Sequence, residues 1–276
     1  MHALPLLLAF LAASLLTPAF LETLERGGHT RANFRGRPLA FPLGAIVPAA
    51  ALVALVPLAL IARLGPAEIF HPELVPIAVY VLGVALLGLI DDTLGPDGAP
   101  RGWRGHAGAL ARGELSTGAL KAAGSLGMAL IAMSWRSLPN GRWLLAAGVL
   151  VLATNLFNLL DLRPGRSAKA LVLLGAGLTI GAGELRPLWA LGLFAGPALV
   201  AGAYDLRERA MLGDTGANLL GALAGLWLVL TLSVTGQLIA LLLMAAITVY
   251  GEFFSISELV ERTPGLRELD SWGRPQ

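Results

Sequence analysis

The sequence contains no cysteine, which removes several kinds of site at once. Without thiols, the chain cannot form disulfide bonds, zinc–thiolate centres or iron–sulfur clusters, and it has no cysteine nucleophile. Charge is also scarce: 14% of the residues are charged, whereas soluble domains carry about 25%. With 56% hydrophobic residues, the chain cannot cover a globular surface with polar groups, which excludes a soluble single-domain enzyme. A disordered protein is excluded because apolar residues are plentiful.

The apolar residues fall into long segments, each near the roughly 20 residues that a membrane-spanning helix requires. Nine such segments are predicted, with the ranges 3–21, 39–64, 74–90, 117–135, 143–160, 168–183, 187–204, 217–234 and 238–256. The 34 glycines and 17 prolines are typical of packed membrane helices rather than of soluble ones. We therefore expect an all-α polytopic membrane protein, one domain over 1–276, with 257–276 as a short cytoplasmic tail.

The positions of the basic residues predict the orientation. Arg26 and further arginines follow the first apolar run instead of preceding it, which indicates an uncleaved helix rather than a signal peptide. With nine spans, four of the 20 Lys and Arg residues lie on the outer side of the membrane, namely Arg63, Arg136, Arg142 and Arg186. The other 16 lie inside, so the positive-inside rule places the N-terminus outside and the C-terminus in the cytoplasm. We expect an integral protein of the plasma membrane. The net charge of +2 is too small to suggest a nucleic-acid partner.

Carboxylates gather at the predicted cytoplasmic face. Asp91 and Asp92 end the third segment, Asp161 follows the fifth, and Asp214 precedes the eighth. Lys121 lies at the start of the fourth segment, on the same side. Charged groups near a bilayer cost free energy, so each is a candidate functional residue.

The Asp91–Asp92 pair favours a cation. Two adjacent carboxylates resist ionising together unless a positive charge compensates, and Mg²⁺ takes one or two carboxylates plus substrate phosphates. Helical neighbours point about 100° apart, so one aspartate can contact the metal while the other reaches a different group. Asp205 lies among Arg207, Glu208 and Arg209, and this pattern predicts a solvated loop.

Three other groups each allow two interpretations. Asp214, between Gly213 and Thr215, either caps a helix or binds a cation at a helix start that favours anions. Asn155 and Asn158, one turn apart, either bond neighbouring helices or line a ligand site.

The third group is a run of cations after the fifth segment, made of Arg163, Arg166 and Lys169. It either reflects the positive-inside rule alone or attracts a polyanion such as a nucleotide diphosphate. Acidic groups for a divalent cation and basic groups for phosphates, placed where lipid meets cytosol, predict phosphoryl transfer from a soluble donor to a lipid phosphate.

These motifs, in this order, resemble those of the polyprenyl-phosphate N-acetylhexosamine-1-phosphate transferases (glycosyltransferase family 4), which include phospho-N-acetylmuramoyl-pentapeptide transferase. LLGLIDD resembles the family's aspartate-rich motif, and GALKAAG resembles its lysine segment. NLFNLLDLRPG resembles N-x-x-N-x-x-D-G-x-D-G, and MLGDTGANLLGA resembles the segment that carries G-D-x-G-S. ANFRGRPLAFPLG is similar to the first cytoplasmic loop.

The resemblance implies helices around a cytoplasmic cleft and transfer of sugar-1-phosphate from a UDP-N-acetylhexosamine to undecaprenyl phosphate. UMP is released, and the product enters peptidoglycan or cell-envelope polysaccharide synthesis. The implied cofactor is Mg²⁺ or Mn²⁺, held by Asp214 and Asp91. The implied catalytic residues are Asp91, Asp92 and Asp214. The implied substrate-binding residues are Lys121 for a phosphate and Asn155, Asn158 and Asp161 for the nucleotide. Whether the chain forms a homodimer is left open.

Several positions differ from the family pattern. Gly95 replaces the last aspartate of D-D-x-x-D, and Ala217 replaces the serine of G-D-x-G-S. Leu162 and Pro164 replace a glycine and an aspartate of N-x-x-N-x-x-D-G-x-D-G, the nucleotide motif. No histidine follows His106, whereas the family carries a histidine-rich loop near the C-terminus. These differences favour an alternative, a non-catalytic paralogue that binds polyprenyl phosphate and acts as a regulator or partner. A transporter or flippase is disfavoured, because its polar residues would lie near the membrane midplane.

Overall fold

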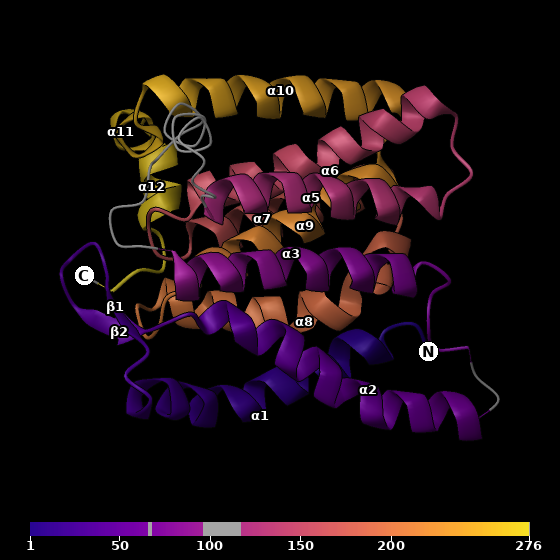
Figure 1. The fold of residues 1–276 in the computed structure, drawn as a ribbon, viewed down its shortest axis with the longest axis horizontal. Helices are drawn as coiled ribbons and strands as arrows, with labels where there is room; N and C mark the ends of the chain where they lie inside the picture. The colour runs from indigo at the N-terminus through magenta and orange to yellow at the C-terminus, as the bar shows by residue number, and fades with distance from the viewer. Residues whose placement is uncertain (66–67, 96–116, 276) are drawn as a thin grey trace.

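The computed structural model describes residues 1–65, 68–95 and 117–275, and this part of the chain is built almost entirely of helices (Figure 1). Its long helices are α1 (Leu4–Arg26), α2 (Ile46–Leu64), α3 (Leu74–Leu94), α5 (Thr117–Ser134), α6 (Asn140–Leu160), α7 (Arg166–Ala182), α8 (Arg186–Leu206), α9 (Gly213–Thr231) and α10 (Val234–Phe253). Its short elements are β1 (Thr30–Ala32), β2 (Pro38–Ala40), the 3₁₀ turn η1 (Leu43–Ala45), α11 (Ile256–Arg262) and α12 (Leu266–Ser271).

Seven of the described helices are long and apolar enough to cross a membrane: α1, α2 together with η1, α3, α6, α8, α9 and α10. Helices α5 and α7, with 18 and 17 residues, pack in the same bundle but do not meet that standard of length and hydropathy. The all-α membrane fold is therefore as expected, whereas the count of nine spans stays a prediction.

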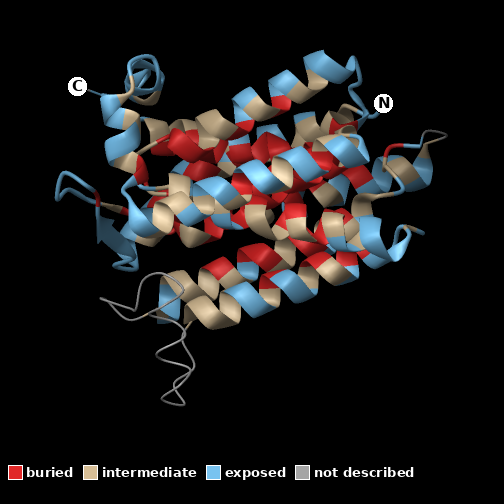
Figure 2. Cartoon of the chain, turned by 90° about the horizontal axis from the view of Figure 1, so that it is seen from above, coloured by how far each residue is buried: buried red, intermediate tan, exposed pale blue. Residues whose placement is uncertain are grey.

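Helix α9 lies at the centre of the bundle. It packs against α3, α6, α7 and α8 and is buried along nearly its whole length, whereas Gln237 and Met244 are the only buried residues of α10. Buried residues gather in the middle of the bundle (Figure 2). Glycines allow the close approach of α9 to α6. A Cβ atom at Gly221 would lie 2.6 Å from the Cα of Thr154, closer than real Cβ contacts. Small residues at helix crossings supply the packing that holds membrane helices together.

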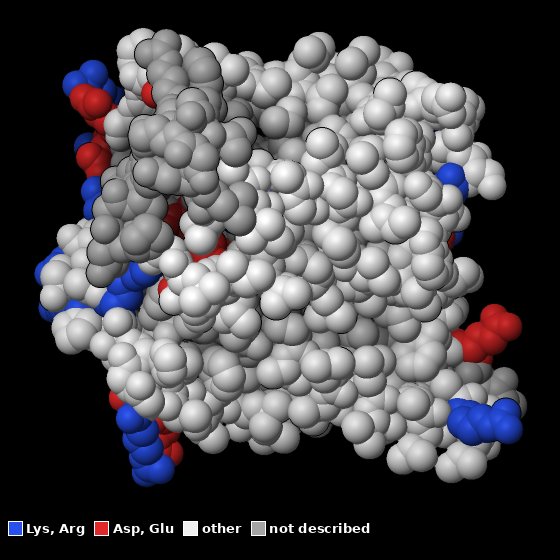
Figure 3. Space-filling view, viewed as in Figure 1, with Lys and Arg blue, Asp and Glu red and all other residues white. Residues whose placement is uncertain are grey.

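On the face drawn in Figure 3, charged side chains gather at two opposite ends, and a wide belt without them separates the ends. The hairpin β1–β2, helices α11 and α12 and the C-terminus lie at one end, and the N-terminus lies toward the other (Figure 1). An uncharged belt is what the hydrocarbon core of a bilayer requires. Arg101, Arg104 and Arg112, predicted to be cytoplasmic, lie outside the described residues.

The orientation can be tested with reporters that work on only one side of the membrane. A reporter active only outside the cytoplasm should be silent when fused after Gln276 and active when fused after Pro139, in the α5–α6 connection. The opposite result, measured as reporter activity per unit of fusion protein, contradicts the predicted orientation.

The α6–α9 contact predicts that replacing a glycine lowers stability at the helix crossing but not at an open position. Gly221→Ala should lower the melting temperature in detergent, because its methyl group must displace the α6 backbone, at a cost of about 1–3 kcal/mol. Gly127→Ala is the matched control, since nothing lies within 4 Å of the added Cβ at this exposed position of α5. The control should be neutral or slightly stabilising. Equal effects at both positions would contradict this packing.

Candidate functional site

The connection after α1 folds against the segment that leads into α9. Strands β1 and β2 pair antiparallel, and the Met211 N–H donates to the Ala40 carbonyl at 3.0 Å. The N–H groups of Leu43 and Gly44 donate in turn to the carbonyls of Met211 and Leu212, at 2.8 and 2.9 Å. These backbone bonds join residues far apart in sequence into one corner at the charged end of the bundle.

Asp92, at the end of α3, holds the start of α9. Its Oδ1 accepts from the Asp214 N–H at 2.9 Å, and its Oδ2 accepts from the Thr215 N–H at 2.8 Å and the Thr215 hydroxyl at 2.6 Å. The first N–H groups of a helix have no partner inside the helix, and a negative charge is favourable there. The capping role that the sequence left open for Asp214 is therefore filled by Asp92.

Gly213 makes room for this contact. Its φ of +70° lies in the left-handed region, and a Cβ atom here would stand 2.7 Å from the Asp92 Oδ2. Any other residue would be strained by the backbone angle and would also push the carboxylate away. The glycine is thus required by the helix start itself.

Lys121 joins two carboxylates from different helices. Its Nζ donates to the Asp91 Oδ2 at 2.9 Å and also to the Asp214 Oδ2. Thus α3, α5 and α9 each contribute one charged side chain to a common point, whereas the sequence predicted only that the three residues lie at one face. Asp91 and Asp92 point to different partners, as expected of helical neighbours. Because both carboxylates bond one ammonium, one cation position is within reach of both.

Asp205 corrects an expectation. The sequence predicts a solvated loop, but Asp205 is only 5% exposed. Its Oδ2 accepts from the Gly165 N–H at 2.7 Å, and its Oδ1 accepts from the Leu212 N–H at 3.3 Å. The reason is that α8 continues to Leu206, so Asp205 belongs to its last turn and points inward, between the α6–α7 connection and the entry to α9.

Asp161 lies at the same acidic end. Its Oδ1 accepts from the Ser167 hydroxyl at 3.1 Å. Burial, together with the negative charge of the nearby Asp205, raises the pKa of Asp161 well above its ordinary value. The charges of Asp214 and Asp92 act on it in the same direction, which indicates that the nucleotide-motif aspartate and the Lys121 group share one electrostatic environment.

The two asparagines of α6 differ. The Asn155 amide donates to the Thr248 hydroxyl of α10 at 3.3 Å, so this side chain links neighbouring helices, one of its two predicted roles. The Asn158 Oδ1 is buried without a hydrogen-bond partner among the described residues. The Nδ2 of Asn218, one turn beyond Asp214 in α9, is likewise buried and unpartnered in this part of the chain. Sequence reasoning missed Asn218, although its place in an apolar helix could have indicated it.

The cations after α6 bind the C-terminal segment, which forms α11 and α12. Arg166 donates to both carboxylate oxygens of Asp270, at 2.7 and 3.0 Å. Lys169 donates to the carbonyls of Leu269 and Trp272, at 2.9 and 3.1 Å, near the end of α12. Arg163 pairs with Glu261 at 3.0 Å. In the structure, these three cations therefore bond to groups of the protein itself. Their predicted binding of a polyanion stays a prediction.

Asp270 is the centre of this junction. Burial raises the pKa of Asp270, but hydrogen bonds from Arg166 and Arg274 outweigh it and lower the pKa to about 2. Arg274 also donates to the Pro164 carbonyl at 2.8 Å, in the connection between α6 and α7. The C-terminal segment is thus fixed on the loop that carries the nucleotide motif.

The donor set allows a divalent cation with two protein ligands. Among residues 1–65, 68–95 and 117–275, no three His, Asp or Glu side chains gather as a metal-ligand set. Asp91 and Asp214 nevertheless converge on one cation, and Mg²⁺ usually binds one or two carboxylates, with substrate phosphates and water completing its octahedron. The residues therefore fit Mg²⁺ as a substrate-assisted site.

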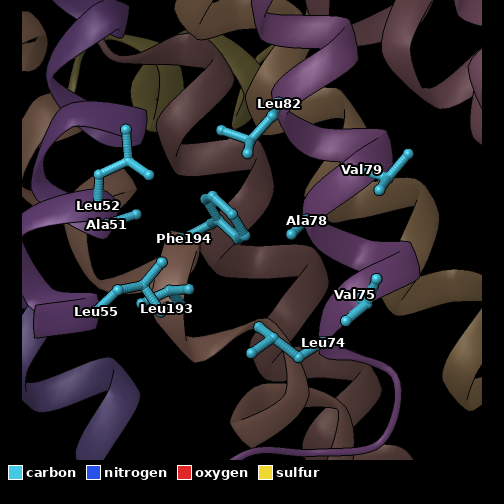
Figure 4. A pocket seen from close by; sticks show the side chains of 10 residues that line it. All are labelled: Ala51, Leu52, Leu55, Leu74, Val75, Ala78, Val79, Leu82, Leu193 and Phe194. Atoms are coloured by element: carbon cyan, nitrogen blue, oxygen red, sulfur yellow. The ribbon is translucent and has the colours of Figure 1, made fainter. Parts of the chain in front are cut away.

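An apolar pocket of about 230 Å³ lies away from these residues, between α2, α3 and α8 (Figure 4). Its lining on α3 runs from Leu74 to Leu82, in the half of the helix far from Asp91. Its lining contains only apolar side chains, so it has no groups for chemistry. The charged corner remains the candidate site.

No protein-family model matches this chain, and no curated protein matches it. The likeness to the sugar-phosphate transferases therefore rests on the five sequence segments that resemble family motifs, and three of them contain Asp91, Lys121 and Asp214.

Asp205 is expected to serve stability. Asp205→Asn replaces one acceptor oxygen by an NH₂ group that faces a backbone N–H, so the variant should lose about 1–3 kcal/mol of folding free energy. Melting temperature in detergent measures this loss. Glu268→Gln is the control, because Glu268 is exposed on α12. A melting temperature unchanged in both variants would show that Asp205 is not the buried acceptor described.

Proposed function

We propose that the protein transfers a sugar-1-phosphate, of the N-acetylhexosamine class, from a UDP-sugar to a polyprenyl phosphate. An oxygen of the lipid phosphate attacks the phosphorus that bears the sugar. A new P–O bond forms as the bond from that phosphorus to the bridging oxygen breaks, and the leaving group is UMP. The product is a polyprenyl diphosphate sugar for cell-envelope polysaccharide or peptidoglycan precursors.

The observation that supports this proposal is the meeting of Asp91, Lys121 and Asp214. These residues come from three motifs and three helices, and they converge at the charged end of a membrane bundle. Phosphoryl transfer needs mainly positioning and charge neutralisation, which carboxylate-held cations and a lysine provide. The place is also suitable, because a lipid phosphate lies at the membrane surface while a nucleotide sugar arrives from the cytosol.

Each residue has a role that follows from its contacts. Asp214 and Asp91 would hold Mg²⁺ or Mn²⁺, which would supply a Lewis acid for the phosphate oxygens. Lys121, bonded to both, orients the carboxylates and donates to a phosphate. Asp92 uses both oxygens on α9, so it acts as a positioning residue that fixes Asp214. Asn158 and Asp161 line the nucleotide side.

One observation favours the alternative, a non-catalytic paralogue that binds polyprenyl phosphate. Arg166 and Lys169, the cations that follow the nucleotide motif, are bound by the C-terminal segment. In that case the protein holds the lipid phosphate at the same corner and acts as a regulator, without turnover. Release of UMP separates the two functions.

The proposal is tested with purified protein in detergent, undecaprenyl phosphate and a panel of UDP-N-acetylhexosamines. UMP should be released with Mg²⁺ or Mn²⁺ and not in excess chelator. Asp214→Asn should keep the melting temperature close to that of the parent, because Lys121 retains Asp91. Its turnover should fall by about 100-fold or more, at least the loss seen when groups that support a metal site are removed.

Glu268→Gln is the control for turnover and should behave like the parent. Full activity of Asp214→Asn, or full turnover in excess chelator, contradicts the metal-assisted transfer. Binding of undecaprenyl phosphate without UMP release from any donor supports the regulator instead.

A further inference from the structure

Arg31 stands at the rim of the charged corner, on strand β1. Its guanidinium lies over the ring of Phe41, 4.2 Å from the ring centroid. Phe41 follows β2 and adjoins Gly213, where an added Cβ would meet both the Phe41 Cε2 at 2.8 Å and the Asp92 Oδ2 at 2.7 Å. The ring therefore lies directly beside the Asp92 carboxylate at the start of α9, and Arg31 covers its face.

The arginine is held in place but not bonded. Within the described ranges, no hydrogen bond or ion pair involves its guanidinium, although its charge acts on Asp92. The hairpin that carries it is tied to the α9 entry by the backbone bonds of Ala40 and Gly44. Stacking of a guanidinium on an aromatic ring is attractive, which favours one orientation of the side chain. Its donors are thus oriented and free to bind a ligand.

The other basic residues of the hairpin differ in this respect. Arg35 donates to the Pro275 carbonyl at 3.0 Å and pairs with Glu208 at 3.3 Å. Arg37 is exposed, and among the described residues its side chain has no contact with the acidic corner. Arg31 alone of the three faces Phe41 and Asp92, so its placement is particular and not a general property of the loop.

The charge of the corner favours an anion once a cation is bound. Asp91, Asp92 and Asp214 provide three negative charges against the single positive charge of Lys121. A divalent cation balances this remainder, and Arg31 then adds a positive charge at the open side. Arginine presents planar donors that match phosphate oxygens in pairs, which lysine cannot do.

We infer that Arg31, oriented by Phe41, binds a phosphate group of a substrate at the start of α9. The inference rests on the proposed function and adds a residue that the sequence motifs did not contain. The phosphate belongs either to the polyprenyl acceptor or to the nucleotide-sugar donor, and the two sources share this chemistry.

The test compares Arg31→Gln and Arg31→Lys with Arg37→Gln, the matched control on the same hairpin. The KM for each substrate is measured at saturating concentration of the other. Arg31→Gln should raise the KM for one substrate about tenfold or more, as expected for loss of a charge-assisted hydrogen bond. Arg31→Lys should recover part of the loss, and Arg37→Gln should match the parent. The substrate whose KM rises is the one whose phosphate Arg31 binds.

A binding measurement keeps this inference separate from catalysis. Geranyl phosphate and inorganic pyrophosphate, each with Mg²⁺, are titrated while the melting temperature is followed. At least one probe should stabilise the parent and Arg37→Gln but not Arg31→Gln. If the parent releases UMP and Arg31→Gln keeps both KM values, the inference is wrong and the proposed function stands. If no UMP is released but binding depends on Arg31, the inference stands and the catalytic proposal fails.

Discussion

The contact between Asp92 and the first turn of α9 is the constraint on which the rest of the corner depends. Helix α9 runs through the centre of the bundle, so its unpaired N–H groups start where water is scarce and need an acceptor. Asp92 supplies that acceptor from α3 with three hydrogen bonds. Charge-assisted bonds of this kind are worth about 1.5–3 kcal/mol each, and loss of the carboxylate would leave buried donors unpaired. The bond therefore fixes the spacing of α3 and α9 at their polar ends.

That spacing places the functional groups. Asp92 holds the first turn of α9, and the side chain of Asp214 in that turn lies close to Asp91. Lys121 of α5 bonds both carboxylates. Lys121 pairs with both carboxylates, so its removal would leave the two acidic side chains without a counter-charge. The same helix start also places Phe41 against Gly213. The hairpin that carries Arg31 and the helices that carry the proposed metal ligands are thus positioned by a single structural element.

The opposite side of the corner is closed by the C-terminal segment. Asp270 joins Arg166 of α7 and Arg274, and Arg274 reaches the Pro164 carbonyl in the nucleotide-motif loop. In that loop, Leu162 and Pro164 replace two residues of the family pattern. The Gly165 N–H of the same loop donates to the Asp205 carboxylate at the end of α8. The loop is therefore held by contacts of this protein's own residues. For the proposed transferase, this arrangement is a physical reason to expect nucleotide recognition that differs from that of the family it resembles.

Composition and hydropathy by themselves determined that the chain is a helical membrane protein, because an apolar run of about 20 residues has few stable alternatives to a spanning helix. The motif order also indicated that Asp91, Lys121 and Asp214 belong together, since each stands at a helix end on the same predicted side. Only the tertiary structure decided what each carboxylate binds. The sequence predicts a cation beside the Asp91–Asp92 pair and a solvated loop at Asp205, yet Asp92 and Asp205 both accept backbone N–H groups from other segments. The position of Arg31 likewise depends on its contact with the Phe41 ring, which lies beside Gly213 at the start of α9, far along the chain. Such contacts depend on how helices pack, and packing joins residues whose separation in sequence carries no local pattern.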